Sequence, residues 1–248
     1  MKDKRLYLYG AHSVKDLLEI HPGIITRLYL RGTLEKHTLD SFRALATKSK
    51  VPVSTVSEKD IYRYVGDVND QGAVALVSNF PYADFDEWIE GVDMDRNPAV
   101  VIMDSLEDPH NVGAVIRTAM GLGASAVIIP SSRQVSVTQT VFKVAAGAAN
   151  HIPIIQAGSL TKVMNKLKKK GFWIGSLGKS DKKADSLLSH EFTAPTVFVV
   201  GNEGSGVRAS VMKDSDFVVS IPIRKEIESY NASVSLAIAL YEWKRQNS

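Results

Sequence analysis

The first 78 residues alternate between two hydrophobic patterns. Short runs of apolar and β-branched residues, typical of strands, are separated by stretches in which apolar residues recur at helical spacing, as Leu39, Phe42 and Leu45 do. Ser13 precedes an apolar stretch and is expected to cap the first helix. A βαβαβαβ order over residues 1–78 predicts a small three-layer α/β domain. The expected strands are 6–9, 24–30, 51–56 and 73–77.

Residues 79–97 interrupt this alternation. Asn79-Phe80-Pro81 ends the last strand, residues 84–95 are acidic and mixed, and Asn97-Pro98 is a second stop signal. The segment is therefore interpreted as a linker that contains one short amphipathic helix.

Longer apolar runs dominate residues 98–248. Their near-continuous hydrophobic character predicts a parallel sheet that helices cover on both faces. Val234, Ile238 and Tyr241 form one stripe of the last expected helix. The expected strands are 99–103, 126–129, 153–155, 172–177, 196–200 and 217–221, and the expected helices are 111–122, 138–149, 160–170 and 231–245.

Composition narrows the chemistry. The 248-residue chain contains no cysteine, which excludes disulfides, thiolate zinc sites, iron–sulfur clusters and a cysteine nucleophile. No metal site is expected. No apolar run approaches the roughly 18 residues that span a bilayer, so we expect no membrane partner and a cytoplasmic location.

The net charge of +3 and the pI of about 8.9 are compatible with nucleic-acid binding but are common in other proteins. The basic residues are interpreted either as RNA contacts or, as is usual for charged runs, as a solvated face. The candidates are Lys166, Lys168, Lys169, Lys170, Lys182 and Lys183, with Arg5, Arg27 and Arg31 in the first domain.

Three loops follow strands of the expected parallel sheet, where ligands of such sheets bind. The first runs from Asp104 to Gly113 and continues into a helix that carries Arg117. Asn111 is expected to cap that helix, and Arg117 would lie on its second turn, near the end that attracts anions. The alternative is an ordinary capped helix with a surface arginine.

The second loop contains three glycines among the six residues 201–206. It matches neither G-x-G-x-x-G nor a Walker loop, and Glu203 in its middle would repel a phosphate. The loop therefore suits a ligand that lacks phosphates or carries positive charge, and S-adenosylmethionine has both properties. The alternative is a plain glycine turn.

The third loop begins at Ile221-Pro222 and ends at Ser229-Tyr230-Asn231, where the last helix starts. Pro222 lacks an N–H at the point where the strand should stop. Ser229 and Asn231 are both residue types that cap helices, so a simple helix cap is the alternative to a binding role.

Taken together, the three loops resemble the SpoU family, also called the TrmH family, of RNA 2′-O-ribose methyltransferases. Residues 111–119 match its first motif, N-x-G-x-x-x-R-T-A, and residues 201–206 match its second, G-x-E-G-x-G. The third motif is matched by Ile221-Pro222 and by residues 229–231. The resemblance covers nearly the whole chain. The N-terminal region looks like the small RNA-binding domain of the RlmB-type branch, which modifies 23S ribosomal RNA.

The resemblance implies a SPOUT-class fold, with a deep trefoil knot in a methyltransferase domain at 98–248 and an RNA substrate-binding domain at 1–78. It also implies S-adenosylmethionine as the cofactor, bound through backbone atoms of Gly201, Ile221 and Tyr230. The implied partners are a second copy of the chain, in a homodimer with the active site close to its interface, and RNA. The expected target is a ribose 2′-hydroxyl, on a guanosine of 23S rRNA, with tRNA as the alternative.

The family gives a central role to the arginine of the first motif, here Arg117, sometimes as a general base. A guanidinium has a pKa above about 12, and deprotonating it at neutral pH would cost roughly 7 kcal/mol. We therefore interpret Arg117 as a clamp on an RNA phosphate that also stabilises the developing alkoxide. Asn111 would orient it, and Glu203, Ser229 and Asn231 would complete the catalytic pocket.

Two positions depart from the family pattern: Lys225 stands where a glycine is usual, and Tyr230 stands where a leucine is usual. They motivate a competing interpretation, a non-catalytic RNA-binding module of the same fold. A third interpretation is a phosphate-binding enzyme, against which Glu203 argues.

Overall fold

The computed structural model describes residues 6–132, 134–178 and 184–248. Three basic candidates, Arg5, Lys182 and Lys183, lie outside these residues. The contacts divide the chain into two compact units. The first comprises Met1–Pro81 and Val137–His151, and the second comprises Tyr82–Ser136 and Ile152–Ser248. The segment 137–151 therefore joins the N-terminal unit, although its position in the sequence placed it in the predicted C-terminal domain.

The first unit is built on a four-stranded sheet with the order β1-β4-β2-β3. β2 and β3 run parallel, whereas β4 pairs antiparallel with β1 and β2. The predicted βαβαβαβ order is confirmed. The elements are β1 (Leu6–Tyr9), α1 (Ala11–Ile20), η1 (Pro22–Ile24), β2 (Ile25–Arg31), α2 (Lys36–Lys48), β3 (Val53–Val56), α3 (Glu58–Val65) and β4 (Ala73–Val77).

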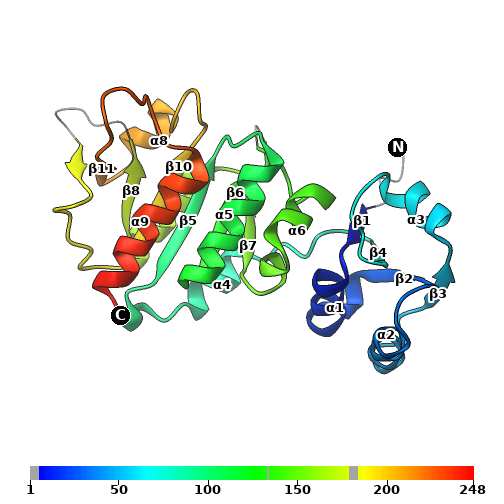
Figure 1. The fold of residues 1–248 in the computed structure, drawn as a ribbon. Helices are drawn as coiled ribbons and strands as arrows, with labels where there is room; N and C mark the ends of the chain where they lie inside the picture. The colour runs from blue at the N-terminus through cyan, green and yellow to red at the C-terminus, as the bar shows by residue number, and fades with distance from the viewer. Residues whose placement is uncertain (1–5, 133, 179–183) are drawn as a thin grey trace. The chain divides into compact units, whose positions relative to one another are not determined.

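Helices cover both faces of this sheet, as the three-layer prediction requires. α3 packs Ile61 and Val65 against Tyr9 and Val74, which are paired across β1 and β4. α1 and α2 contact each other on the opposite side of the strands (Figure 1). The predicted cap at Ser13 is wrong. α1 begins at Ala11, three residues earlier than a cap at Ser13 would allow, because Gly10 has a φ of 109° and turns the chain directly after β1. Ser13 is therefore buried inside the helix.

The segment 137–151 is held to the first unit by polar and aromatic contacts. It contains α6 (Gln139–Ala145) and the short η3 (Ala148–Asn150). The Asn150 side chain donates to the carbonyl of Ser13 at 3.0 Å, and the ammonium of Lys143 lies 5.5 Å from the ring centre of Tyr9. Burial lowers the pKa of Lys143, partly opposed by the charge of Asp70.

The second unit contains a seven-stranded sheet with the order β7-β6-β5-β10-β8-β11-β9, in which every pairing is parallel. Its strands are β5 (Ala99–Asp104), β6 (Ala126–Pro130), β7 (Ile154–Ala157), β8 (Trp173–Leu177), β9 (Asp185–Ser186), β10 (Thr196–Gly201) and β11 (Phe217–Ser220). Its helices are α4 (Phe85–Gly91), η2 (Met94–Arg96), α5 (Pro109–Leu122), α7 (Leu160–Lys170), α8 (Ala209–Lys213) and α9 (Ala232–Gln246).

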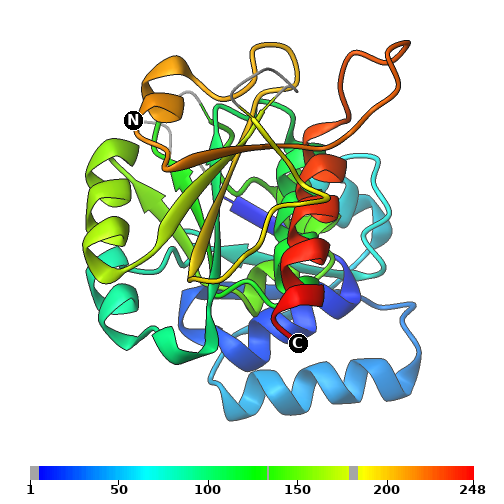
Figure 2. The same cartoon turned by 90° about the vertical axis from the view of Figure 1, so that its left-hand side faces the viewer.

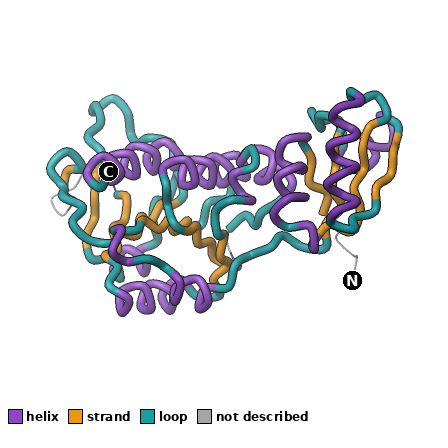
Figure 3. Tube along the Cα trace, turned by 90° about the horizontal axis from the view of Figure 1, so that it is seen from below, coloured by secondary structure: helices purple, strands orange, loops and turns teal. Residues whose placement is uncertain are grey.

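Both faces of the parallel sheet are buried, as predicted. α7 packs Leu160, Met164 and Leu167 into one core cluster, together with residues of α4 and α8. α5 and α9 contact each other on the other face (Figure 2). Figure 3 shows the strands of each unit between helices. Within the described residues, no helix combines the length and the apolar character needed to cross a membrane.

The predicted linker is only partly a linker. Its short helix exists as α4, capped by Asp84, which accepts from the N–H of Glu87 at 2.9 Å. Ile89 of this helix is buried in the core of the second unit, so the segment belongs to that unit's packing.

Two predicted helices differ from the structure. The helix expected over 138–149 is interrupted after α6, because Ala146 and Gly147 both have positive φ values, 51° and 90°. In α9, the stripe of Val234, Ile238 and Tyr241 does not form the core contact. Val234 is 44% and Tyr241 62% exposed. The buried residues of α9 are Ala232, Leu236, Ala239, Leu240 and Trp243.

The trefoil knot stays a prediction.

Candidate active site

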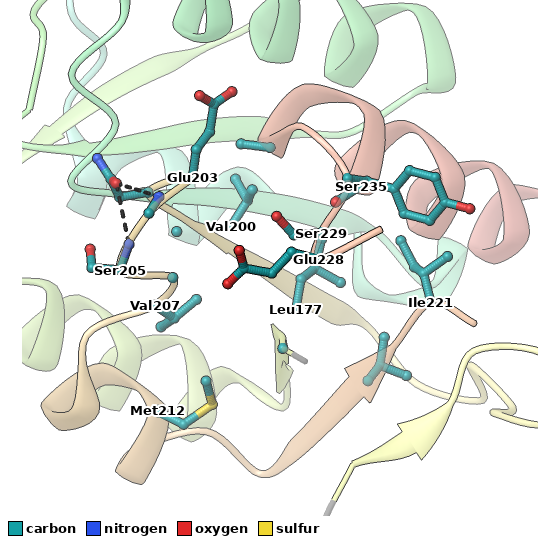
Figure 4. Close-up of a pocket in the computed structure, with 18 of the residues that line it drawn as sticks. Leu177, Val200, Glu203, Ser205, Val207, Met212, Ile221, Glu228, Ser229 and Ser235 are labelled. Carbon is teal, nitrogen blue, oxygen red and sulfur yellow. Dashed lines mark hydrogen bonds between the residues drawn. The ribbon is translucent and has the colours of Figure 1, made fainter. Parts of the chain in front are cut away.

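A pocket of about 370 Å³ lies where β8, β10 and β11 end (Figure 4). Its volume is within the range of roughly 300–1,000 Å³ that is usual for small-ligand sites. This is the carboxyl edge of the parallel sheet, as the sequence predicted. The described lining is Leu177, Gly178, residues 200–207, Met212, Val219, Ile221, Ile223, residues 228–230, Ala232 and Ser235.

One wall of the pocket is the glycine loop, residues 201–207, which closes tightly on itself. The backbones of Asn202 and Gly206 exchange hydrogen bonds of 3.1 and 2.8 Å. The side-chain oxygen of Asn202 accepts from the N–H groups of Gly204, at 2.9 Å, and Ser205, at 3.4 Å. A Cβ at Gly201 would lie 2.1 Å from the carbonyl carbon of Gly206, so only glycine fits there.

An ion pair between a buried aspartate and a partly exposed arginine holds the end of the glycine loop. Asp104, at the end of β5, is fully buried and accepts from the backbone N–H of Arg208 at 2.8 Å. Its Oδ1 also accepts from the guanidinium of Arg208 at Nε and lies 2.6 Å from the outer nitrogen. Sequence reasoning missed this pair. A carboxylate at the end of an otherwise apolar strand was the signal that could have found it.

Three of the predicted catalytic residues meet at the edge of the pocket. The Asn111 amide nitrogen donates to Oε1 of Glu203 at 2.7 Å. The Asn231 amide nitrogen donates to the Asn111 oxygen at 2.9 Å and also to Glu203. α5, the glycine loop and the start of α9 each supply one side chain. We call Asn111, Glu203 and Asn231 the amide–carboxylate cluster.

Asn111 has a different structural role from the one predicted. Asp108 caps α5, accepting from the N–H of His110 at 2.9 Å, and Pro109 occupies the first helical position. Asn111 therefore lies inside the first turn, 8% exposed, and its amide binds Glu203 and Asn231 instead of orienting Arg117.

Because the helix begins earlier than expected, Arg117 lies on its third turn, exposed and beyond the turn where the helix dipole acts. The predicted cap at Asn231 is confirmed. Its side chain accepts from the N–H of Ser233 at 2.9 Å.

All three predicted cofactor-binding residues, Gly201, Ile221 and Tyr230, line the pocket, as do Glu203 and Ser229. Asn111, Arg117 and Asn231 are not part of the described lining. Sequence reasoning missed several lining residues. Three are apolar residues near the ends of strands, Leu177, Val200 and Val219, and two are polar, Glu228 and Ser235.

Lys225, the departure from the family's glycine, is exposed and has no positive φ. The backbone there suits an L-residue without strain. Lys225 is also absent from the described lining of the pocket. The departure therefore introduces no left-handed backbone strain at this position.

Most of the lysines on α7 face carboxylates. Lys166 contacts Asp86, Lys168 contacts Asp216 at 2.7 Å, and Lys170 lies 4.0 Å from Glu90. These pairs favour a solvated surface of the second unit over an RNA contact.

In the first unit, the guanidinium of Arg31 is paired with Asp70 and Glu58. Arg27 is exposed and donates to the hydroxyl of Ser54 at 2.9 Å. Within residues 6–132, 134–178 and 184–248, no three His, Asp or Glu side chains are grouped as metal ligands.

The amino-acid sequence matches the profiles of two known families. Residues 98–241 match the profile of the SpoU rRNA methylase family, and residues 7–83 match that of the RNA 2′-O ribose methyltransferase substrate-binding domain. The chain belongs to the SpoU methylase family.

Individual relatives agree with this assignment. The chain is 33% identical over 243 residues to the 23S rRNA (guanosine-2′-O-)-methyltransferase RlmB of Pseudomonas putida, covering 96% of both chains. It is 33% identical to a putative TrmH family tRNA/rRNA methyltransferase of Staphylococcus haemolyticus, covering 97% of this chain and 96% of that one. A crystal structure of the SpoU methyltransferase AviRb from Streptomyces viridochromogenes, in complex with AdoMet, superposes with a TM-score of 0.81 at 22% identity. The match covers 98% of this chain and 90% of that chain.

Proposed function

We propose that this protein transfers a methyl group from S-adenosylmethionine to a ribose 2′-hydroxyl of RNA, on a guanosine of 23S rRNA. The observation that carries the proposal is the pocket at the carboxyl edge of the sheet, bordered by the amide–carboxylate cluster. Full-length similarity to RlmB of Pseudomonas putida supports the substrate. An RNA substrate of this kind also supports the expected cytoplasmic location.

The residues of the pocket fit the cofactor. Leu177, Val200, Val219 and Ile221 provide apolar walls for an adenosine, and the glycine loop offers backbone groups at close range. Two carboxylates, those of Glu203 and Glu228, suit a ligand that carries positive charge better than one that carries phosphates. The same fit argues against the phosphate-binding interpretation and against a module that has lost its cofactor.

S-Adenosylmethionine would be held by the glycine loop and by residues 221–230, and it would supply an electrophilic methyl group to the ribose 2′-oxygen, whose proton would pass to water. The chain's own residues must align the ribose, and alignment alone can contribute up to roughly 7–11 kcal/mol. Asn111 and Asn231 hold the Glu203 carboxylate in one orientation at the pocket edge. Arg117 is exposed on the same helix as Asn111, where its permanently charged guanidinium can bind an RNA phosphate and stabilise negative charge on the 2′-oxygen. Ser229 adds a hydroxyl to the pocket wall.

We infer that the protein forms a homodimer through the exposed surface of α5 and α9. This surface carries an apolar groove that includes the exposed Leu188, Val234 and Tyr241. Thr118, adjacent to Arg117, also lines the groove, so a second copy bound there would lie beside the predicted catalytic arginine. Light scattering of the wild type and of Val234→Asp tests this inference. A dimeric wild type and a folded, monomeric variant are expected, and a monomeric wild type would refute it.

The methyl-transfer proposal is tested with labelled S-adenosylmethionine and two RNA fractions that lack modification, 23S rRNA and tRNA. Label is expected in 23S rRNA, at one ribose that resists alkaline cleavage. Label on a base would refute ribose methylation. Label in tRNA alone would favour a tRNA methyltransferase instead, as the name of the Staphylococcus haemolyticus relative, a putative TrmH family tRNA/rRNA methyltransferase, allows.

The role of Arg117 has its own test. Arg117→Lys keeps the charge but loses the planar, bidentate geometry, so we expect methyl transfer to fall by about a hundredfold while folding is unchanged. Retention of most activity would refute the clamp.

A further inference from the structure

Glu228 is a charged side chain in the pocket that the proposed catalytic roles do not use. It lies between β11 and α9, and its carboxylate extends toward the middle of the pocket, near Leu177 (Figure 4). Glu203 points away from that region, and its Oε1 is held by Asn111 and Asn231. The two carboxylates therefore occupy different parts of the site.

The position of Glu228 matters because the reaction changes the charge of what the pocket holds. S-Adenosylmethionine and its product, S-adenosylhomocysteine, carry the same ammonium and the same carboxylate. They differ by one methyl group and by the positive charge on sulfur, which methyl transfer removes. A carboxylate in the pocket attracts the charged cofactor and has no such attraction for the neutral thioether of the product.

We propose that Glu228 makes the pocket select S-adenosylmethionine over S-adenosylhomocysteine by charge. The proposal rests on the proposed function, since it concerns the cofactor of that reaction. The apolar walls cannot make this distinction, because the contacts of Val200, Val219 and Ile221 are equally available to both molecules.

The size of the effect follows from the solvation of the site. Glu228 is an exposed residue, so water screens the interaction of its carboxylate with a nearby charge more than it would screen that of a buried carboxylate. We expect the charge to contribute about a three- to tenfold preference for S-adenosylmethionine. The consequence for the reaction is faster release of the spent cofactor, because loss of the attraction acts mainly on the dissociation rate.

The experiment measures dissociation constants by calorimetry for three proteins: the wild type, Glu228→Gln, and the matched control Glu226→Gln. Glu226 is exposed on the same segment but does not belong to the described lining. The probes are S-adenosylmethionine, S-adenosylhomocysteine and sinefungin, which carries an amine in place of the sulfonium methyl and is therefore positively charged. Circular dichroism melting confirms that each variant folds.

In Glu228→Gln, binding of S-adenosylmethionine and sinefungin should weaken by about three- to tenfold while binding of S-adenosylhomocysteine changes little. Glu226→Gln should leave all three constants unchanged. An equal loss for all three probes would overturn the proposal, since it would place Glu228 on the shared ammonium. The proposal would also be overturned if the ratio of the dissociation constants for S-adenosylmethionine and S-adenosylhomocysteine were the same in Glu228→Gln as in the wild type. If the wild type binds none of the probes, the proposed function itself fails, which is a separate result.

Discussion

The two segments that enclose the pocket are held in contrasting ways. The glycine loop, residues 201–207, is closed by reciprocal backbone hydrogen bonds and tied to the sheet by the pair of Asp104 and Arg208. The opposite wall, residues 221–230, is exposed along most of its length. Within it, the N–H of Ile227 donates to the carbonyl of Arg224 at 3.0 Å.

This difference indicates a division of labour within one binding site. The glycine loop is organised before any ligand arrives, so it contributes contacts without an ordering cost. The opposite wall carries Glu228, Ser229 and Tyr230 on an exposed segment, and we expect part of its ordering to accompany binding. Variants in the first segment should therefore act on folding, and variants in the second should act on affinity.

The strongest test of the glycine loop is Gly201→Ala. The added methyl would lie 2.1–2.3 Å from the backbone of Gly206 and Val207, which cannot shift as a flexible side chain would. We expect loss of about 4 kcal/mol or more in the free energy of unfolding, or no folded protein. Urea denaturation measures it. Gly204→Ala is the matched control, because its Cβ would make only an ordinary contact of 3.5 Å, and it should remain stable. Equal stability of Gly201→Ala and Gly204→Ala would show that the tight closure of the glycine loop does not contribute to folding.

The next largest effect is expected for Asp104→Asn. The substitution leaves the Arg208 guanidinium without its charged partner at a site where Asp104 is fully buried. We expect a loss of about 2–4 kcal/mol in stability, measured by denaturant unfolding. Asp214→Asn, at the partly exposed end of α8, should change stability by less than about 0.5 kcal/mol. A similar loss in the two variants would mean that the pair does not hold the loop.

In the opposite wall, residues 221–230, Tyr230→Ala should lower cofactor affinity without lowering the free energy of unfolding. Tyr230 is 36% exposed and lines the pocket. We expect the stability to change by no more than about 0.5 kcal/mol, whereas loss of the aromatic contact should weaken S-adenosylmethionine binding by about two- to tenfold. Calorimetry and denaturant unfolding of the same samples measure the two quantities. A stability loss as large as that of Asp104→Asn would contradict the expectation that variants in residues 221–230 act on affinity and not on folding.

The smallest effect concerns α9, which follows the exposed segment. Hydrogen bonds from Arg245 and then Gln246 lower the pKa of Glu242 from 4.5 to about 2. A lowered carboxyl pKa adds stability that is fully present above pH 4.5 and is lost as the pH falls toward 2. Glu242→Gln should therefore be slightly less stable than the wild type at pH 7, and the two should converge only as the pH falls to about 2 and below. Denaturant unfolding at both pH values measures this. A difference that stays constant with pH would show that the ion pair does not contribute.

The contrast between the two walls also marks what the sequence can predict. α7 has the predicted bounds because Ser159 caps it, apolar residues follow at helical spacing, and Gly171 ends it. β9 and α8 were missed, since two and five residues are too short for a periodic pattern.

In the site, motif residues predicted the three amino acids of the amide–carboxylate cluster but not their bonds. Asn111 and Glu203 are 92 positions apart, and Asn111 and Asn231 are 120 apart, so local pattern carries no information on their contact. The ion pair of Asp104 and Arg208 was missed for the same reason, at a separation of 104.

The segment 137–151 makes the first unit discontinuous. The polypeptide passes between the two units at three junctions, after residues 81, 136 and 151. The first unit cannot therefore be exchanged between relatives as a single stretch of gene. A chimaera that takes residues 1–81 from one protein and the rest from another would pair the Ser13 carbonyl and Tyr9 of one ancestry with Asn150 and Lys143 of the other. Substitutions on the two sides of this contact are thus expected to be inherited together, even though more than a hundred residues separate them along the chain.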